Sequence, residues 1–194
     1  MILFASRNRH KLAEIRAILG PSILSTDDLP DLPHIEETAD TFEGNAILKA
    51  RGLALASGLW TLADDSGLEV DALHGEPGVQ SAYYAGRHAT DADNLNKLHH
   101  AMRGVSNRAA RFRCVLALSS PDGQTRTLSG VCEGRLADTP RGANGFGYDP
   151  LFIPDGHSST FAELPASTKN ALSHRARALA VAKHEWAEHF ASFA

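Results

Sequence analysis

The stretch AARFRCVLALSSPDGQTRTLSGVCE, residues 109–133, decides the fold that the sequence predicts. Apolar residues alternate along its first part, over residues 109–119, which is the pattern of a strand with one buried face. The side chains that share this face are Phe112, Cys114, Leu116 and Leu118. A turn with the sequence PDGQ follows, and a second strand-like run covers residues 125–133. The whole stretch is typical of an antiparallel hairpin.

Helical periodicity on both sides of this hairpin predicts four helices. The first follows a polar loop and ends at Gly20-Pro21, and the second begins near Asp40 or Thr41 and ends at Ser57-Gly58. The third opens with a capping box formed by Thr90 and Asp93. The fourth is expected from about Ser167 to Phe190.

Short apolar strands are expected at Ile2–Ala5, at Trp60–Ala63 and at Leu151–Ile153. Helices that alternate with short strands and a long antiparallel hairpin indicate an α/β fold with a mixed sheet.

Length and charge limit the classes of function. The chain has 194 residues, which suits one domain over residues 1–194 or one domain with a lobe. Its net charge of −4 gives no sign of the clustered positive charge that duplex binding requires. It has neither an apolar run of roughly 20 residues nor the pattern of a signal peptide. We therefore expect a cytoplasmic protein that binds neither nucleic acid nor a membrane, with Cys114 and Cys132 as buried thiols.

Two adjacent carboxylates, Asp64 and Asp65, lie in the stretch LADDSGLEV, residues 62–70. They come at the end of a strand that looks buried, and uncompensated burial of like charges is costly. A divalent cation or a catalytic proton transfer would explain them. The alternative is an ordinary Asp-Ser-Gly turn with both charges in solvent.

Three further groups of polar residues lie where predicted elements end. Ser6, Asn8 and Lys11 could hold phosphate oxygens between a strand and a helix, or could simply cap that helix. Glu36 and Glu37 could bind Mg²⁺, or could favour the dipole of the following helix.

The third group is the loop GANGFGYD, residues 142–149, whose glycines allow a backbone to approach a flat ligand closely. Phe146 or Tyr148 could stack on a base, and Asp149 could accept hydrogen bonds from it. The alternative is a loop whose aromatic side chains anchor it to the core. Lys169 lies near the start of the last helix, where a cation is poorly placed unless an anionic ligand binds there. The alternative is a solvated surface charge.

Together these motifs closely resemble one family, the inosine triphosphate pyrophosphatases, also described as XTP/dITP diphosphatases. The resemblance covers almost the whole chain, in order. The segments that carry it are SRNRHK, EET followed by TFEGNAILKA, LADDSGLEVDALHGEPGVQSAYYAG, FRCVLAL, GFGYDPLF, TFAEL and KNALSHRARAL.

The resemblance implies an enzyme that hydrolyses ITP, dITP and XTP to the monophosphate and pyrophosphate, and so cleanses the nucleotide pool. It implies Mg²⁺ as the cofactor, water attack at the α-phosphorus and a homodimer as the assembly. The implied fold is an elongated mixed β-sheet flanked by helices, with two lobes and the active-site cleft between them.

The resemblance also assigns roles to individual residues. It implies that Asp65 and Lys49 are catalytic and that Glu36 and Asp65 bind the metal. Whether Asp64 or Asp65 is the base stays open, as does a metal role for Glu37 or Glu43. The implied triphosphate loop comprises Ser6, Arg7, Asn8, Arg9, His10 and Lys11. The other implied substrate contacts are Ser66, Phe146, Gly147, Tyr148, Asp149, Lys169, His174 and Arg175.

Two positions depart from the family pattern. Gly44 stands where many members carry a glutamate, and Tyr83 stands where an arginine is often found. Competing interpretations are a pyrophosphatase for modified pyrimidine nucleotides, a nucleotide sensor without activity, and a phosphomonoesterase with an aspartyl nucleophile. The last would need a DxD-type strand end, whereas this strand offers DDS.

Overall fold

The structure is a computed structural model that describes residues 1–190. Residue contacts divide the chain into two compact units, and each has its own hydrophobic cluster. Unit 1 comprises Met1–Asp65, Cys114–Gly130 and the segment that begins at Arg175. Unit 2 comprises Ser66–Arg113 and Val131–His174. The single domain expected for residues 1–194 stays a prediction, as does a cleft between two lobes.

Six strands form one sheet in the order β2-β1-β3-β4-β5-β6. Their bounds are β1 Ile2–Phe4, β2 Leu24–Ser25, β3 Trp60–Val70, β4 Ala109–Ser119, β5 Thr125–Leu136 and β6 Phe152–Pro154. β1 pairs in parallel with β2 and β3, with Leu3 opposite Leu24 and Thr61, whereas β5 pairs antiparallel with β6. The sheet is therefore mixed, and the α/β fold with a mixed sheet flanked by helices is confirmed.

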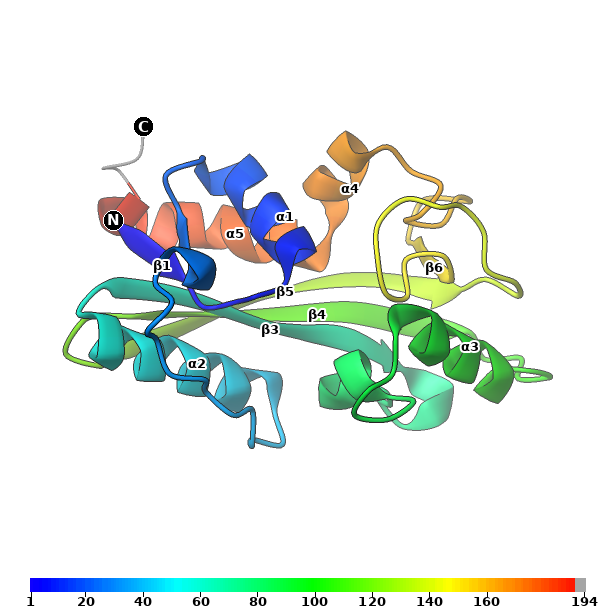
Figure 1. Cartoon of the computed structure of the whole chain (residues 1–194). Coiled ribbons are helices and arrows are strands. Elements are labelled where there is room, and N and C mark those ends of the chain that lie inside the picture. Colours follow the sequence, from blue (N-terminus) through cyan, green and yellow to red (C-terminus); the bar gives the residue numbers. More distant parts are fainter. Residues whose placement is uncertain (191–194) are drawn as a thin grey trace. The chain divides into compact units, whose positions relative to one another are not determined.

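β4 and β5 are the hairpin expected from residues 109–133 (Figure 1). The connecting turn is closed by two backbone hydrogen bonds: Ser120 donates to Gln124, and Gly123 donates to Ser120, each at 2.9 Å. Gly123 has a φ of 87°, a value that favours glycine, so the sequence PDGQ suits this turn. β5 continues past residue 133 to Leu136, where it pairs with β6.

The α-helices are α1 Arg9–Leu19, α2 Phe42–Ser57, α3 Asp91–Ala101, α4 Ala166–Leu172, α5 His174–Glu185 and α6 Ala187–Phe190. Short 3₁₀ helices are η1 Thr26–Asp28, η2 Asp71–Leu73 and η3 Gly78–Tyr83. The side chains of Asn8, Thr41 and Thr90 cap the first three α-helices by accepting backbone N–H groups. The capping box of Thr90 and Asp93 is confirmed.

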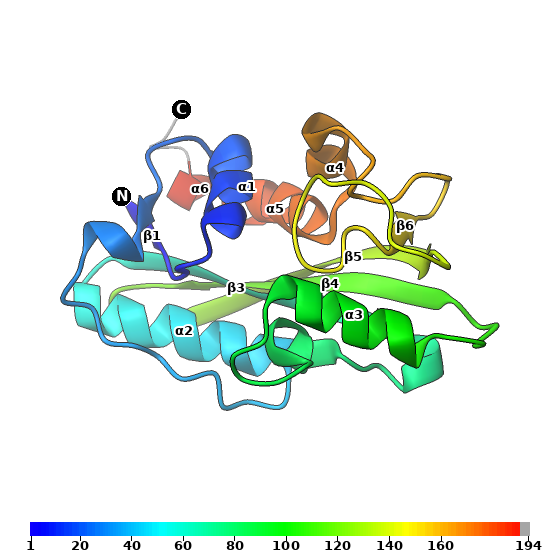
Figure 2. The same cartoon turned by 45° about the vertical axis from the view of Figure 1, so that its right-hand side comes forward.

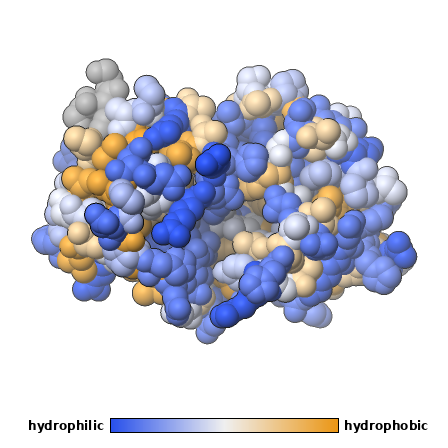
Figure 3. Space-filling model, viewed as in Figure 1, coloured by the Kyte–Doolittle hydropathy of each residue, from blue (hydrophilic) through white to orange (hydrophobic). Residues whose placement is uncertain are grey.

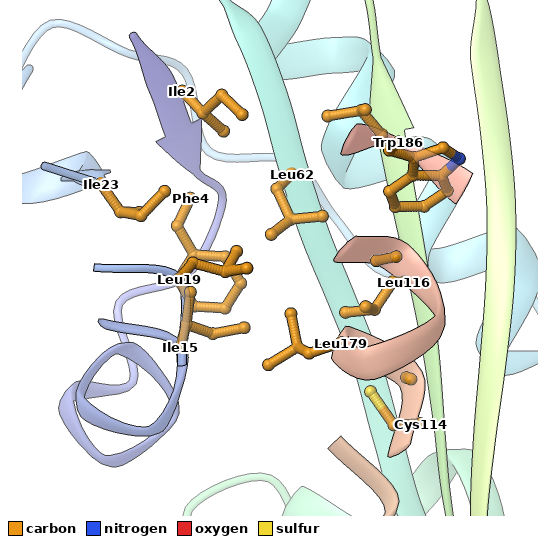
Figure 4. Packing of buried hydrophobic residues seen from close by; sticks show 13 residues of the cluster. Ile2, Phe4, Ile15, Leu19, Ile23, Leu62, Cys114, Leu116, Leu179 and Trp186 are labelled. Carbon is orange, nitrogen blue, oxygen red and sulfur yellow. The ribbon is translucent and has the colours of Figure 1, made fainter. Parts of the chain in front are cut away.

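Helices cover both faces of the strands in unit 1. Figures 1 and 2 show α2 on one side of these strands and α1 and α5 on the other. The cluster in Figure 4 fills the space between α1, α5 and the sheet. It brings together Phe4 of β1, Ile15 of α1, Leu62 of β3, Leu116 of β4 and Leu179 of α5. The segments that carry the charged side chains of the site are thus fixed by apolar packing.

Two predictions about single elements are wrong. The helix expected from Ser167 to Phe190 is interrupted at Ser173, whose ψ of 157° is extended, so that α4 ends at Leu172 and α5 begins at His174. Helical periodicity does not reveal such a break, because the apolar positions on its two sides still match one helix.

The strand expected over Trp60–Ala63 continues to Val70, so Asp64 and Asp65 lie inside β3 rather than at its end. Two charges and a glycine made the sequence look like a turn. Both carboxylates are nevertheless buried, with residue exposures of 0% and 6%.

None of the helices in residues 1–190 has the length and apolar character needed to cross a membrane. Both cysteines are buried thiols, as expected. Cys114 belongs to the cluster of unit 1 and Cys132 to that of unit 2.

Candidate active site

The predicted site residues fall into two sets, one in each unit. In unit 1, ion pairs join several of them, together with Glu14, into what we call the charged group: Lys11, Glu14, Glu37, Lys49, Asp64, Asp65 and Arg175. In unit 2 they include the segment Gly145–Asp149, which we call the aromatic loop, together with Lys169 and His174.

Asp64 is bound by two cations. Arg175 donates from Nε and Nη2 to Oδ2 of Asp64, at 3.1 and 2.8 Å. Lys11 Nζ lies 3.2 Å from Oδ1 of the same carboxylate. The guanidinium of Arg175 also contacts the carboxylate of Glu14 on α1. Since the Arg175 and Asp64 side chains are 1% and 0% exposed, this is a buried ionic network that joins β3 to α1 and α5.

Asp65 meets a different cation, because successive side chains of a strand point to opposite faces. Its Oδ1 lies 3.6 Å from Nζ of Lys49 on α2. That ammonium also lies 3.1 Å from Oε1 of Glu37 and donates to the backbone carbonyl of Asp64 at 2.8 Å. β3 therefore accommodates two adjacent carboxylates by turning them toward separate counter-charges.

The two aspartates differ in how readily they ionise. Burial alone would raise the pKa of Asp64, but Lys11, Arg175 and Lys49 outweigh it and hold that pKa well below its usual range. For Asp65, burial is the larger effect and raises the pKa to about 6 against the opposing pull of Lys49 and Lys11. The negative charges of Glu37 and Asp64 raise it further. Asp65, unlike Asp64, can therefore gain and lose a proton near neutral pH.

Lys49 stays charged in this environment. Burial would lower its pKa, yet Asp65, Asp64 and Glu37 together raise that pKa above the ordinary lysine value. Lys49 is thus a buried cation held against the carboxylate that titrates.

The loop before α1 shows both roles considered for it. Asn8 caps the helix by accepting from the backbone N–H groups of His10 and Lys11, and Ser6 accepts from that of Asn8. Arg7 and Arg9 are exposed, as is His10. Figure 3 shows strongly hydrophilic surface over the start of α1. A helix N-terminus with cationic side chains around it suits an anion.

The acidic residues before α2 differ in their contacts. Glu36 and Glu37 are both exposed, and Glu37 joins the charged group through Lys49. Glu43, the other open alternative, accepts from the hydroxyl of Thr127. Residues 1–190 hold no cluster of three or more His, Cys, Asp or Glu side chains that could bind a metal ion. A metal role for Glu36 stays a prediction.

Gly44 has a packing reason for departing from the family pattern. A Cβ at this position would lie 2.6 Å from Cβ of Ala39 and 3.1 Å from Oγ1 of Thr41. A glutamate at position 44 would therefore require the segment before α2 to move.

The aromatic loop is organised by Asp149. Its Oδ2 accepts from the backbone N–H of Phe146 at 2.8 Å and from Nζ of Lys169 at 2.6 Å. The same ammonium lies 4.7 Å from the centre of the Phe146 ring. Gly145 has a φ of 76°, and a Cβ there would lie 2.0 Å from Oδ2 of Asp149, so glycine is required.

The remaining predicted contacts have distinct environments. Tyr148 is buried, and its hydroxyl donates to the carbonyl of Ser81 at 2.9 Å, so it anchors the loop rather than presenting a free ring. The His174 ring stacks on Phe112 with 4.8 Å between ring centres. Ser66 follows the acidic pair on β3 and is half-buried.

Sequence reasoning missed two contacts of this site. It gave no role to Glu14, although Glu14 lies one helical turn after Lys11, and it did not link Arg175 to Asp64. The separation of 111 residues between those two leaves no local signal. A nucleotide contact from Arg175 stays a prediction, and in this structure its guanidinium binds carboxylates.

Opposite effects on stability are expected from Asp64→Asn and Asp65→Asn. The raised pKa of Asp65 favours its protonated form, so its contribution to stability is present below about pH 4 and lost as pH rises through about 6. Asp65→Asn should therefore stabilise the protein by about 1–3 kcal/mol above about pH 7. The lowered pKa of Asp64 means that its ionised form stabilises the fold. Asp64→Asn should cost about 3–5 kcal/mol, because Arg175 stays buried without a charged partner on β3.

Urea unfolding of both variants and of the unsubstituted protein measures this difference. The gain from Asp65→Asn should shrink as the pH is lowered toward about 4. Changes of the same sign in the two variants above about pH 7 would contradict the assignment.

Comparisons with known proteins identify the family of this chain. A family model described as the Ham1 family matches residues 2–185. A protein named dITP/XTP pyrophosphatase from Geobacter sulfurreducens is 51% identical over 187 residues, which cover 94% of each chain. One of the same name from Rhodospirillum centenum is 49% identical over 91% of this chain and 90% of its own.

Solved structures are similar over nearly the full length. A HAM1 protein from Coxiella burnetii has a TM-score of 0.88 and 44% identity, covering 96% of this chain and 98% of its own. The Ham1 protein of Staphylococcus aureus has a TM-score of 0.87 and 39% identity, covering 97% of this chain and 98% of its own. The resemblance seen in the sequence is therefore confirmed, and the chain belongs to the Ham1 family.

Proposed function

We propose that this protein hydrolyses dITP, XTP and ITP to the monophosphate and pyrophosphate. The observation that carries the proposal is the pairing of Asp65, a buried carboxylate with a pKa of about 6, with the buried cation Lys49. A base poised near the working pH beside a fixed positive charge suits the activation of water next to a phosphate. The shared name of the relatives from two bacteria supports the choice of substrate.

The triphosphate is proposed to bind at the start of α1. Ser6 and Asn8 bring a hydroxyl and an amide to the helix N-terminus, and Lys11 brings an ammonium close to Asp64. Arg7, Arg9 and His10 are exposed donors on the same loop. Together they can neutralise several phosphate oxygens.

Asp65 is the proposed general base. It takes a proton from a water molecule, whose oxygen then attacks the α-phosphorus while the bond to the pyrophosphate oxygen breaks. Lys49 offsets negative charge that develops on the phosphoryl oxygens. Asp64 stays ionised throughout, because Arg175 and Lys11 hold it. Its part is to fix these two cations and the geometry of β3.

A divalent cation fits this group. Mg²⁺ commonly binds one or two carboxylates together with substrate phosphates and waters, so it needs no cage of three protein ligands. Asp65 and Glu37 both contact the ammonium of Lys49, which places two carboxylates within reach of one site. We propose these two as ligands for Mg²⁺, which would supply charge stabilisation for the transferred and leaving oxygens.

The base is proposed to bind at the aromatic loop. Phe146 offers a half-buried ring, and Lys169, His174 and Ser66 offer hydrogen-bond donors in unit 2. Hypoxanthine and xanthine carry a 6-oxo acceptor where adenine carries a 6-amino donor. A donor such as Lys169 would pair with the oxo group and leave adenine mismatched, which is costly in a buried site.

A homodimer, which the family resemblance implies, and a cytoplasmic location, which the sequence patterns predict, belong to this proposal. Size-exclusion chromatography with light scattering measures the first, and a single-chain mass at all concentrations would contradict it.

A panel of nucleoside triphosphates tests the activity. We expect pyrophosphate, and no orthophosphate, from dITP, XTP and ITP, with kcat/KM at least about tenfold higher than for ATP. Guanine also carries a 6-oxo group, so selectivity against GTP requires separate rejection of its 2-amino group. Both products are quantified in each reaction. Release of orthophosphate instead would indicate phosphomonoesterase chemistry, and equal efficiency on all substrates would refute the proposed selectivity.

The pH dependence of kcat/KM tests the role of Asp65. The surrounding side chains raise the pKa of Asp65 to about 6, and Mg²⁺ bound to the same carboxylate would lower it. Activity should therefore rise with pH as this group loses its proton and level off by about pH 6. Asp65→Asn should lower kcat by about 100-fold or more and remove this limb. Asp122→Asn, in the exposed turn between β4 and β5, serves as a control and should keep both. Near-normal turnover by Asp65→Asn would exclude Asp65 as the base.

The adjacent glutamates provide a matched test of metal binding. Chelation with EDTA should stop pyrophosphate release, and added Mg²⁺ should restore it. Glu37→Gln should raise the Mg²⁺ concentration for half-maximal activity by about tenfold, whereas Glu36→Gln should leave it almost unchanged. The reverse ranking would assign the ligand to Glu36, and activity that persists in EDTA would remove the metal from the mechanism.

A further inference from the structure

Asp91, the first residue of α3, contacts the middle of the aromatic loop. Its Oδ2 accepts a hydrogen bond from the backbone N–H of Gly147 at 3.0 Å. Gly147 has a φ of 60°, a left-handed conformation, and lies between Phe146 and the buried Tyr148. Asp91 thus binds the backbone of the aromatic loop at its left-handed residue, from a position 56 residues away in the sequence.

The rest of the loop is fixed from other directions. Asp149 holds the backbone of Phe146 and the ammonium of Lys169, and Tyr148 binds the carbonyl of Ser81. Asp91 provides one more anchor by accepting a hydrogen bond from the N–H of Gly147. Because Gly147 directly follows Phe146, this bond restricts how the Phe146 ring can be presented.

The same helix turn also holds the segment that contains Ser81. Asn94 of α3 accepts from the backbone N–H of Ala85 at 2.7 Å and donates to the carbonyl of Ala82 at 3.1 Å. The start of α3 therefore binds the backbone next to each partner of the contact between Tyr148 and Ser81, at Gly147 and at Ala82. It acts as a common support for the two segments.

We propose that Asp91 is a positioning residue, which fixes the aromatic loop through Gly147 so that the loop can bind the purine base. This inference rests on the proposed function, since it takes the aromatic loop as the base site. Asp91 touches no reacting atom in this proposal, so its loss should affect binding of the base and leave the chemical step intact.

Asp93 offers a matched control in the same helix turn. It is an exposed aspartate whose Oδ2 accepts from the backbone N–H and hydroxyl of Thr90, and so caps α3 without contacting the aromatic loop. Both Asp91→Ala and Asp93→Ala remove one negative charge from the first turn of α3, where the helix dipole favours it. They differ in the contact with Gly147.

The first measurement compares these two variants by hydrogen–deuterium exchange and by kinetics with dITP. Asp91→Ala should speed exchange of the amides in residues 145–149 and raise KM by about fivefold, with kcat changed by less than about twofold. Asp93→Ala should change neither the exchange of these amides nor KM. Asp91→Asn, which keeps an acceptor oxygen at the same position, should restore most of the lost affinity.

Inorganic tripolyphosphate, which has no base, separates the two halves of the substrate. Its inhibition constant should be the same for Asp91→Ala and the unsubstituted protein. If Asp91→Ala does not fold, Asp91→Glu keeps the charge and moves the carboxylate away from Gly147, so it should give the same pattern. Exchange and KM values equal to those of Asp93→Ala would overturn the proposal, as would a loss confined to kcat.

Failure of the proposed function would look different. In that case the unsubstituted protein would release no pyrophosphate from dITP. The exchange comparison and equilibrium binding of dITP would then still decide whether Asp91 positions a base-binding loop. Unchanged dITP binding in Asp91→Ala would overturn it.

Discussion

The structure depends on how β3 buries two neighbouring carboxylates. An isolated ionised carboxylate is too costly to place in a protein interior, so each must have a partner or lose its charge. Asp64 takes the first course through Arg175 and Lys11, and Asp65 moves toward the second, with a pKa of about 6. The alternation of a β-strand makes this possible, because it sends one side chain toward α1 and α5 and the next toward α2. In a helix, neighbouring side chains point only about 100° apart, so the two carboxylates would not face opposite sides.

This division has a functional meaning under the proposed mechanism. The aspartate with two cations is fixed in its charged form and serves as a structural counter-ion. The aspartate with one shared cation keeps the freedom to exchange a proton. Both environments come from residues of unit 1. In unit 2, the aromatic loop likewise depends on a buried carboxylate that is paired with a cation. There a single carboxylate, Asp149, organises a backbone N–H and the buried ammonium of Lys169.

Much of the fold could be predicted from the sequence because its signals are local. The hairpin of β4 and β5, the caps at Thr41 and Thr90 and the capping box follow from neighbouring residues. The length of β3 and the break at Ser173 could not be predicted. β3 includes Asp64 and Asp65 because cations distant in the sequence compensate their charges. No local sequence pattern predicts these ion pairs. For the candidate site, residue types and motif order predicted Lys49 and Asp65, which the structure places in contact. The contacts of Glu37, Glu14 and Asp91 depend on tertiary geometry, which spacing alone does not encode.

The partner of Asp64 has a consequence for the synthesis of the chain. Arg175 follows Asp64 by 111 residues, so a ribosome completes β3 long before the guanidinium that compensates it has been made. Until α5 docks, Asp64 has Lys11 beside it but lacks the second of its two cations, so burying this part of β3 is less favourable. The ion pair of Arg175 with Asp64 also closes a long loop of the chain, and such contacts form more slowly than local ones. We therefore expect the core of unit 1 to form only after α5 has been synthesised and Arg175 can bind Asp64.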